Sequence, residues 1–307
     1  MSRAATLTVV VAAVLEGAVG EPPTRWHPVA WLGALVGRVD REWDRPLAVG
    51  ALAAVALPIG TALAVGSLVT AAGRVAVPLG IAVAGGVLFL STSLRRLLSA
   101  ANSVIRDSEG DVDAARAGLL ALAGRDASEL SPPLLRSAAV ESAAENIGDG
   151  LVAPLTAFAL ALVLAPLAGL APLPTAVAAA AWVKAVNTMD SMLGYQSKLV
   201  GTPAARLDDA VMWLPARVSA LLLAAAFGDW GSLWRASRWL DRVPSPNSGW
   251  PMGVAAAGLR VRLEKPGVYV LNADRDLPSV AAARRAVRRV GVAGLLAYLL
   301  VGVIAWF

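Results

Sequence analysis

Long apolar segments alternate along this chain with polar segments rich in arginine and aspartate, and this alternation constrains the fold more than any single motif. The chain is 57% hydrophobic and 16% charged over 307 residues, whereas soluble domains are usually about one quarter charged. A helix needs about 20 apolar residues to cross the hydrocarbon core of a bilayer. The pattern therefore predicts an all-α, polytopic integral membrane protein with substantial cytoplasmic helical loops.

The apolar stretches predict the membrane spans of a single membrane-embedded domain covering residues 1–307. The stretch at 210–228 keeps only about ten uninterrupted apolar residues after Pro215 and Arg217, so we expect it to be re-entrant or interfacial. With that stretch on one side, the polar segments 21–46, 92–150, 184–209 and 229–287 share a face. The expected spans are about 4–20, 47–71, 75–91, 151–166, 171–183 and 290–307.

The distribution of charge predicts the orientation of the chain. Nearly all arginine and lysine residues lie in the polar segments, and Arg74 is almost the only charge on the opposite side. Positive charge accumulates in cytoplasmic loops, so we expect a multi-pass protein of the inner (plasma) membrane with its active face in the cytoplasm. The net charge of +5 needs no nucleic acid to explain it, since no basic stripe alternates with aromatic residues.

The residue inventory restricts the chemistry. The chain has no cysteine, and His27 is its single histidine. Disulfides, iron–sulfur clusters and cysteine nucleophiles are excluded, and neither a Ser-His-Asp triad nor a histidine-rich metal site is expected. No lysine follows a GxxxxG pattern, so there is no P-loop. Chemistry must rely on Asp, Glu, Asn, Arg, Ser and the few lysines.

Three carboxylates precede a long apolar run in "ESAAENIGDGLVAP", residues 141–154. Glu141, Glu145 and Asp149 are four residues apart, which on a helix places them along one slowly drifting stripe. Like charges repel there unless a cation lies opposite, and Mg²⁺ prefers oxygen ligands and bridges to phosphate. Asn146 could add a neutral ligand. The alternative is an exposed acidic helix end.

A second polar face occurs in "KAVNTMDSMLGYQSK", residues 184–198, where the chain leaves an apolar helix. Lys184 could neutralise phosphate oxygens, and Asn187 and Asp190 could hold a metal ion or a nucleotide. The alternative is a capped helix end.

A third polar group lies in "GTPAARLDDAVMWLPAR", residues 201–217. Arg206 and Arg217 can each grip a phosphate or carboxylate with two donors, and Asp208 and Asp209 are possible metal ligands. Asp209 shares a helix face with Arg206, so a plain ion pair between them is the alternative.

Two further segments offer polar groups. In "GEPPTRWHPVAWLG", residues 20–33, Arg25 and His27 could meet an anionic ligand, or the segment could be an interfacial anchor. In "SPNSGWP", Asn247 and Ser248 offer uncharged donors and acceptors, although composition alone indicates a plain loop. Glu16 is a carboxylate within an expected span and is therefore a functional suspect.

Five of these stretches, in order, resemble the successive signature blocks of the CobD/CbiB family. The blocks extend from about residue 16 to residue 270 and read "HPVAWLG", "ESAAENIGDGLVAPL", "NTMDSMLGY", "AARLDDAVMWLPARVSA" and "SPNSGWPMGVAAAGL". The family often shows an aspartate where this chain has Glu21. This conservative departure leaves the carboxylate in place but alters how far it extends from the backbone.

The resemblance implies a reaction. Family members are membrane-bound enzymes of cobalamin biosynthesis that act as adenosylcobinamide-phosphate synthases. They join the free propionate carboxylate of adenosylcobyric acid to (R)-1-amino-2-propanol or its O-phosphate as an amide. The phosphorylated form of the reaction makes the enzyme an ATP-dependent ligase, so the expected cofactors are ATP and Mg²⁺, and the expected partners are the corrinoid, the aminopropanol (phosphate) and the lipid bilayer.

The individual roles follow from residue chemistry and are expected to converge in one pocket at the cytoplasmic face. The expected catalytic residues are Glu141, Glu145, Asp190 and Lys184. The expected metal ligands are Glu141, Glu145, Asp149, Asp208 and Asp209. The expected substrate- and phosphate-binding residues are Arg25, His27, Asn146, Asn187, Arg206, Arg217, Asn247 and Ser248.

Two other functions use similar features. A Mg²⁺-dependent membrane phospho-alcohol transferase would also use aspartates, and Asp149-Gly150 resembles the start of its motif, but the Ala-Arg that should follow soon afterwards is absent. A non-enzymatic transport or signalling relative would place polar breaks in mid-membrane, whereas these clusters lie at the ends of spans.

Overall fold

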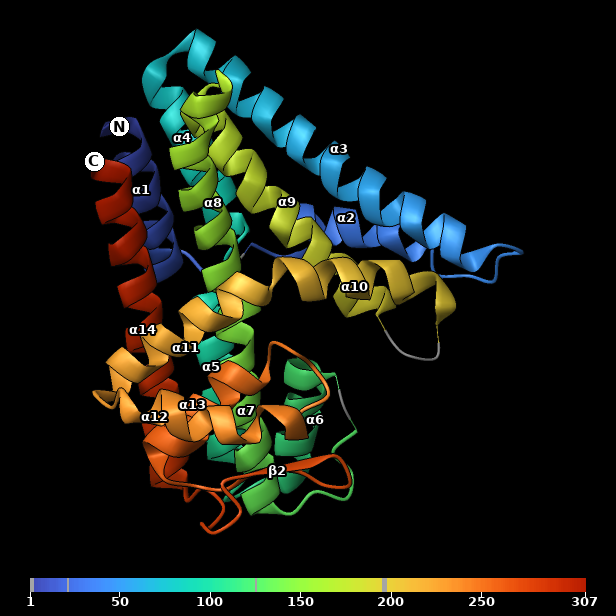
Figure 1. The fold of residues 1–307 in the computed structure, drawn as a ribbon, viewed down its shortest axis with the longest axis vertical. Helices are drawn as coiled ribbons and strands as arrows, with labels where there is room; N and C mark the ends of the chain where they lie inside the picture. The colour runs from blue at the N-terminus through green and yellow to red at the C-terminus, as the bar shows by residue number, and fades with distance from the viewer. Residues whose placement is uncertain (1–2, 21, 125, 195–197) are drawn as a thin grey trace. The chain divides into compact units, whose positions relative to one another are not determined.

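The computed structural model of the chain describes residues 3–20, 22–124, 126–194 and 198–307 (Figure 1). Within these residues the regular structure is helical except for one pair of short strands. The predicted all-α polytopic membrane class is confirmed. The chain divides into two compact units, each described by itself below.

Unit 1 is a helical bundle built from Met1–Ser93, Asp149–Met212 and Tyr298–Phe307. The long helix α3 packs against α9 and α4, α8 packs against α9, and α1 packs against α4 (Figure 1). The shorter helices α2 and α10 also pack against α9. The bounds are α1 Arg3–Ala18, α2 Pro28–Gly37, α3 Pro46–Val75, α4 Val77–Leu90, α8 Ala153–Leu164, α9 Pro172–Leu193 and α10 Thr202–Val211, with short 3₁₀ turns at Thr24–Trp26, Ala165–Ala168 and Leu199–Gly201.

Local sequence explains where these helices begin and how closely they pack. Proline opens α2, α3 and α9, at Pro28, Pro46 and Pro172, where its fixed φ suits the first turn and its missing N–H is not needed. At Gly85 a Cβ atom would lie 2.5 Å from Val11 Cγ1. The α1–α4 contact therefore depends on a small residue, as is common between membrane helices.

Unit 2 comprises Leu94–Gly148 and Trp213–Ala297. Helices α5, α6 and α7 pack against one another, and α13 packs against α7, α11 and α12. Asp111 caps α6 by accepting a hydrogen bond from Ala114 N at 3.0 Å, and Gly124 ends it in the left-handed conformation (φ 61°). The bounds are α5 Leu94–Asp107, α6 Val112–Ala123, α7 Pro132–Ile147, α11 Trp213–Phe227, α12 Gly231–Ala236 and α13 Gly249–Leu259, with a 3₁₀ turn at Ser237–Arg242.

The strand pair in unit 2 lies inside the polar segment 229–287. Strand β1 (Leu263–Lys265) pairs antiparallel with β2 (Tyr269–Leu271). The intervening Pro266-Gly267 forms a tight turn in which Val268 N donates to Lys265 O at 2.9 Å and Gly267 adopts φ 73°. Proline followed by a glycine with positive φ is typical of a type II turn.

Helix α14 (Val280–Trp306) and the π-helical turn Gly148–Val152 that follows α7 contribute to both units. Among the residues that the structure describes, four helical stretches are long and apolar enough to cross a membrane, and a fifth arises if the bent pair α10 and α11 counts as one span. The six-span arrangement and the placement of residues 210–228 stay predictions. The four stretches are Pro46–Val75, Val77–Asp107, Pro132–Ala168 and Val280–Trp306.

Candidate functional site

An acidic cluster in unit 1 brings together polar residues from two of the sequence blocks. Asn187 and Asp190 lie on the last turns of α9, and Asp208 lies on α10, which packs against α9. Burial and, to a smaller extent, the negative charge of Asp190 raise the pKa of Asp208 to about 7, against the opposing hydrogen bond from Asn187. Burial and then the charge of Asp209 raise the pKa of Asp190. These carboxylates are therefore close enough to disfavour one another's charged forms.

One oxygen of this cluster lacks a donor. The Oδ1 atom of Asp208 is buried and accepts no hydrogen bond from any residue that the structure describes. A buried acceptor without a donor is costly, and such atoms in native structures call for an explanation. A cation would satisfy Asp208 Oδ1 and remove the repulsion within the cluster.

The cluster is better suited to a magnesium ion that keeps several waters than to a metal ion enclosed by protein ligands alone. No group of three or more Asp, Glu or His side chains among the described residues is arranged to hold a metal ion by itself. Mg²⁺ usually keeps several waters and uses one or two carboxylates together with substrate phosphates. Asp190 and Asp208 fit that requirement, and the wider metal set of five carboxylates stays a prediction.

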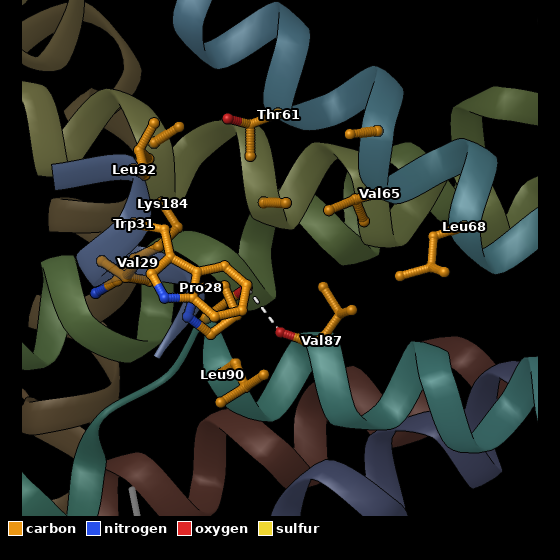
Figure 2. Close-up of a pocket in the computed structure, with 14 residues that line it drawn as sticks. Pro28, Val29, Trp31, Leu32, Thr61, Val65, Leu68, Val87, Leu90 and Lys184 are labelled. Atoms are coloured by element: carbon orange, nitrogen blue, oxygen red, sulfur yellow. Dashed lines mark hydrogen bonds between the residues drawn. The ribbon is translucent and has the colours of Figure 1, made fainter. Parts of the chain in front are cut away.

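Lys184 lies one turn before Asn187 on α9 and lines a pocket of about 350 Å³ in unit 1 (Figure 2). The pocket is otherwise almost entirely apolar, and Pro28 and Trp31 of α2 form part of its wall. The structure thus brings the "HPVAWLG" block and Lys184, the first residue of the second polar face, to one pocket. A volume of this size is within the range of small-molecule sites.

His27 and Arg25 have local structural contacts. His27 is the N-cap of α2, and its Nδ1 atom accepts a hydrogen bond from Val29 N at 3.2 Å. The exposed Arg25 guanidinium lies 6.0 Å from the centre of the Trp26 ring, and Arg25 O accepts from Trp31 Nε1 at 3.0 Å. These contacts favour the interfacial-anchor interpretation of this segment.

Glu141 in unit 2 is buried and not part of an exposed helix end. Its side chain is 3% exposed. Ser137 Oγ donates to Oε1 at 2.7 Å, and Tyr269 OH donates to Oε2 at 2.8 Å. Ser137 Oγ in turn accepts from Glu264 N at 2.8 Å. The carboxylate therefore ties α7 to the strand pair.

The remaining residues of this block lie farther along the same helical stretch. Glu145 and Asn146 are half-buried on the last turn of α7. Asp149 lies in the π-helical turn Gly148–Val152 and belongs to unit 1. A π turn adds a residue to the helical repeat, and the alignment of Glu141, Glu145 and Asp149 along one stripe stays a prediction.

Arg217 on α11 is held in a fixed orientation. Its guanidinium lies 4.6 Å from the centre of the Trp213 ring and 5.8 Å from that of Trp250, and it donates to Asn247 Oδ1 at 2.7 Å. Asn247 and Ser248 are buried, so the "SPNSGWP" segment is more than a plain loop. A guanidinium fixed by stacking is suited to binding a carboxylate or phosphate.

Within the segment itself, Ser245 Oγ accepts hydrogen bonds from Asn247 N at 3.2 Å and from Ser248 N at 3.3 Å. The turn before α13 is therefore internally braced. This bracing fixes the amide that Arg217 contacts.

A buried network in unit 1 surrounds Glu16 of α1. Glu16 is 5% exposed and accepts a hydrogen bond from Thr92 Oγ1 at 2.8 Å, and Thr92 Oγ1 lies 3.0 Å from Tyr298 OH. The hydroxyl of Thr92, which follows α4, therefore links Glu16 of α1 to Tyr298 of α14. The neighbouring Glu21 lies outside the described residues.

Several residues in these arrangements were not predicted from the sequence. Trp213 stands four residues before Arg217, and that spacing on a helix could have indicated the stacking. Trp250 and Tyr269 come from distant segments, for which no local pattern exists. Arg206 is exposed on α10, and its phosphate contact stays a prediction.

Comparison with known proteins gives a consistent answer over most of the chain. The family model described as CobD/Cbib protein matches residues 9–297. A probable cobalamin biosynthesis protein CobD from Methanothrix thermoacetophila is 37% identical over 306 residues, which cover 95% of this chain and 94% of that protein. The cobalamin biosynthesis protein CobD of Klebsiella pneumoniae is 36% identical and covers 96% of both chains. The cobalamin biosynthesis protein CbiB of Salmonella choleraesuis is 36% identical and covers 94% and 93%. No solved structure matches the chain.

Proposed function

The chain belongs to the CobD/CbiB family of cobalamin biosynthesis proteins, and on that premise we propose that it is an ATP-dependent acid–amine ligase. The proposed reaction joins adenosylcobyric acid to (R)-1-amino-2-propanol O-phosphate, or to aminopropanol, and gives adenosylcobinamide phosphate or adenosylcobinamide.

The observation that carries this proposal is the acidic cluster of unit 1. A carboxylate whose pKa is raised to about 7 and whose buried Oδ1 atom has no donor among the described residues is poorly explained as a structural group. The same carboxylate is well explained as one half of a magnesium site. We assign Asp190 and Asp208 as the ligands, with Asn187 orienting Asp208, and Mg²⁺ would supply charge neutralisation for the phosphates of ATP.

The chemistry of amide formation accounts for the need for ATP. A carboxylate is a poor acyl donor at neutral pH. In the proposed first step, a carboxylate oxygen of the corrinoid attacks the γ-phosphorus of ATP, and ADP leaves. In the second step the amine nitrogen attacks the acyl carbon, the C–O bond to phosphate breaks, inorganic phosphate leaves, and the nitrogen loses a proton. Neither step requires a cysteine, a histidine triad or a protein nucleophile.

The chain's own residues would position the reactants and stabilise charge. Lys184, one turn from Asn187, would bind phosphate oxygens at the mouth of the apolar pocket of unit 1. In unit 2, the guanidinium of Arg217, fixed by Trp213 and Asn247, would bind an anionic group of a substrate. The buried Glu141 would act mainly by holding α7 against the strand pair, and its predicted catalytic role stays a prediction.

The function is tested by complementation of a strain that accumulates cobyric acid, with the corrinoid product identified by its mass. We expect the wild-type chain to restore a corrinoid that carries the aminopropanol amide. Accumulation of unchanged cobyric acid, with the protein present in the membrane, would contradict the proposal.

A matched pair of variants connects the function to the cluster. Asp208→Asn is expected to lower product formation by at least about 100-fold, because the loss of a residue that only orients a metal ligand already costs about 10–100-fold. Asp113→Asn removes an acid that is 91% exposed and is expected to leave product formation unchanged.

A further inference from the structure

A groove on unit 1 is separate from every residue assigned above. It lies between the C-terminal half of α3 and the first turns of α9 and has a volume of about 570 Å³. Most of its wall is made of alanine, leucine, glycine and proline residues. Such a wall suits a flexible hydrocarbon chain.

Four side chains with hydrogen-bond donors interrupt this apolar wall, and one of them, Thr70, donates to Gly66 O at 2.7 Å. Arg74, Ser67 and Thr175 all line the groove. Within the described part of the chain, none of their side chains makes a hydrogen bond or an ion pair. Arg74 is also exposed, so its guanidinium is available to an anion.

The position of Arg74 places it at the level of lipid headgroups. It lies on the last turn of α3, which is long and apolar enough to cross a membrane. Leu170, in the connection between α8 and α9, lines the same groove, so the α3–α4 and α8–α9 connections lie at one end of unit 1. A charged side chain at the end of a span extends toward the membrane surface, where phosphates are available.

We propose that this groove binds a phospholipid with a negatively charged headgroup, in the leaflet opposite the polar segments 21–46 and 184–209 of unit 1. The lipid phosphate would pair with Arg74. Ser67 lies two helical turns, about 10 Å, from Arg74 along α3. Ser67 and Thr175 would donate to the ester carbonyls, and the acyl chain would continue along the apolar wall. The order of cation, hydroxyls and hydrocarbon surface matches the order of groups in a glycerophospholipid.

A second copy of the chain fits this groove less well. Small residues do allow close packing of membrane helices. In a two-fold interface, however, each copy presents the same patch, so Arg74 would face an apolar groove or another Arg74. Charge complementarity therefore favours an anionic lipid.

The test uses the full chain reconstituted in nanodiscs of phosphatidylcholine that contain phosphatidylglycerol, with bound lipids measured by native mass spectrometry after release. We expect the wild-type chain to retain phosphatidylglycerol in preference to phosphatidylcholine. Arg74→Gln should lower retained phosphatidylglycerol about tenfold, as expected for a lost charge-assisted contact. Arg38→Gln, which removes an exposed arginine of unit 1 outside the groove, should leave retention unchanged.

A second variant tests the hydrocarbon part of the groove. Ala71 is an exposed groove residue, so Ala71→Phe should reduce retention of both lipids while thermal stability in detergent stays at the wild-type value. Equal loss in Arg74→Gln and Arg38→Gln, or unchanged retention in Ala71→Phe, would overturn the proposal. So would displacement of phosphatidylglycerol by an equal concentration of glycerol phosphate, which would indicate a free-phosphate site, or a dimer that Arg74→Gln disrupts.

Discussion

Replacing Asp208 by asparagine is expected to stabilise the chain toward alkaline pH while abolishing its activity. Asparagine keeps the shape of the side chain but cannot ionise. The pKa of Asp208 is about 7 in the folded chain, because burial raises it from its ordinary value of 3.8. At about 1.4 kcal/mol per pKa unit, this difference corresponds to about 4 kcal/mol of folding free energy.

The sign of the pH dependence follows from the direction of the shift. The unfolded chain loses this proton near pH 3.8, and the folded chain keeps it until about pH 7. The stability contributed by the protonated Asp208 is therefore complete below the unfolded pKa and is lost as the pH rises through the folded pKa. Between pH 5 and pH 8 the wild-type chain should lose about 3 kcal/mol more folding free energy than Asp208→Asn.

The assay is thermal unfolding of the purified proteins in one detergent and at one heating rate, at pH 5, 6, 7 and 8. A difference of about 3 kcal/mol corresponds to roughly 6 °C in the midpoint. The gap between Asp208→Asn and the wild-type chain should widen with pH, and Mg²⁺ with ATP should close it by stabilising only the wild-type chain. Parallel curves for the two proteins, with the exposed Asp113→Asn as the control, would refute the reasoning.

Substitutions at three other positions test the contacts described above. Tyr269→Phe should cost about 1–3 kcal/mol of unfolding free energy, because the buried Glu141 loses a donor; an unchanged thermal midpoint would count against this network. Thr92→Val should destabilise the chain similarly by depriving Glu16 of its donor, whereas Thr92→Ser, which keeps the hydroxyl, should restore the midpoint. Arg217→Lys should raise the KM for an anionic substrate about tenfold without changing the midpoint, since lysine keeps the charge but not the stacked, fixed guanidinium; equal KM values would show that the fixed geometry is not used.

Local patterns predicted the helices well. The apolar stretches at 47–71 and 75–91 correspond to α3 and α4, which end and begin on either side of Ala76. The strand pair was not predicted, because three-residue strands carry too little alternation to be recognised, although Pro266-Gly267 is a turn signal.

Long-range pairing could not be predicted, because periodicity reports on a helix face and not on what that face meets. Glu141 and Tyr269 are 128 residues apart, and the tryptophan that completes the contacts of Arg217 comes from another helix. The burial of individual side chains could not be predicted from the sequence either. Asp208 and Asp209 are neighbours in sequence, but only Asp208 has a fully buried oxygen without a donor among the described residues.

The proposed ligase function requires above all that ATP cleavage and amide formation are coupled at the acidic cluster. The direct measurement is ADP release by the purified chain in nanodiscs, with adenosylcobyric acid and the amine added singly and together, alongside the amide product determined by mass. We expect equimolar ADP and amide only when both substrates and Mg²⁺ are present, and neither product from Asp208→Asn above the background. Amide formation without ATP, or wild-type rates in Asp208→Asn, would contradict the proposed function.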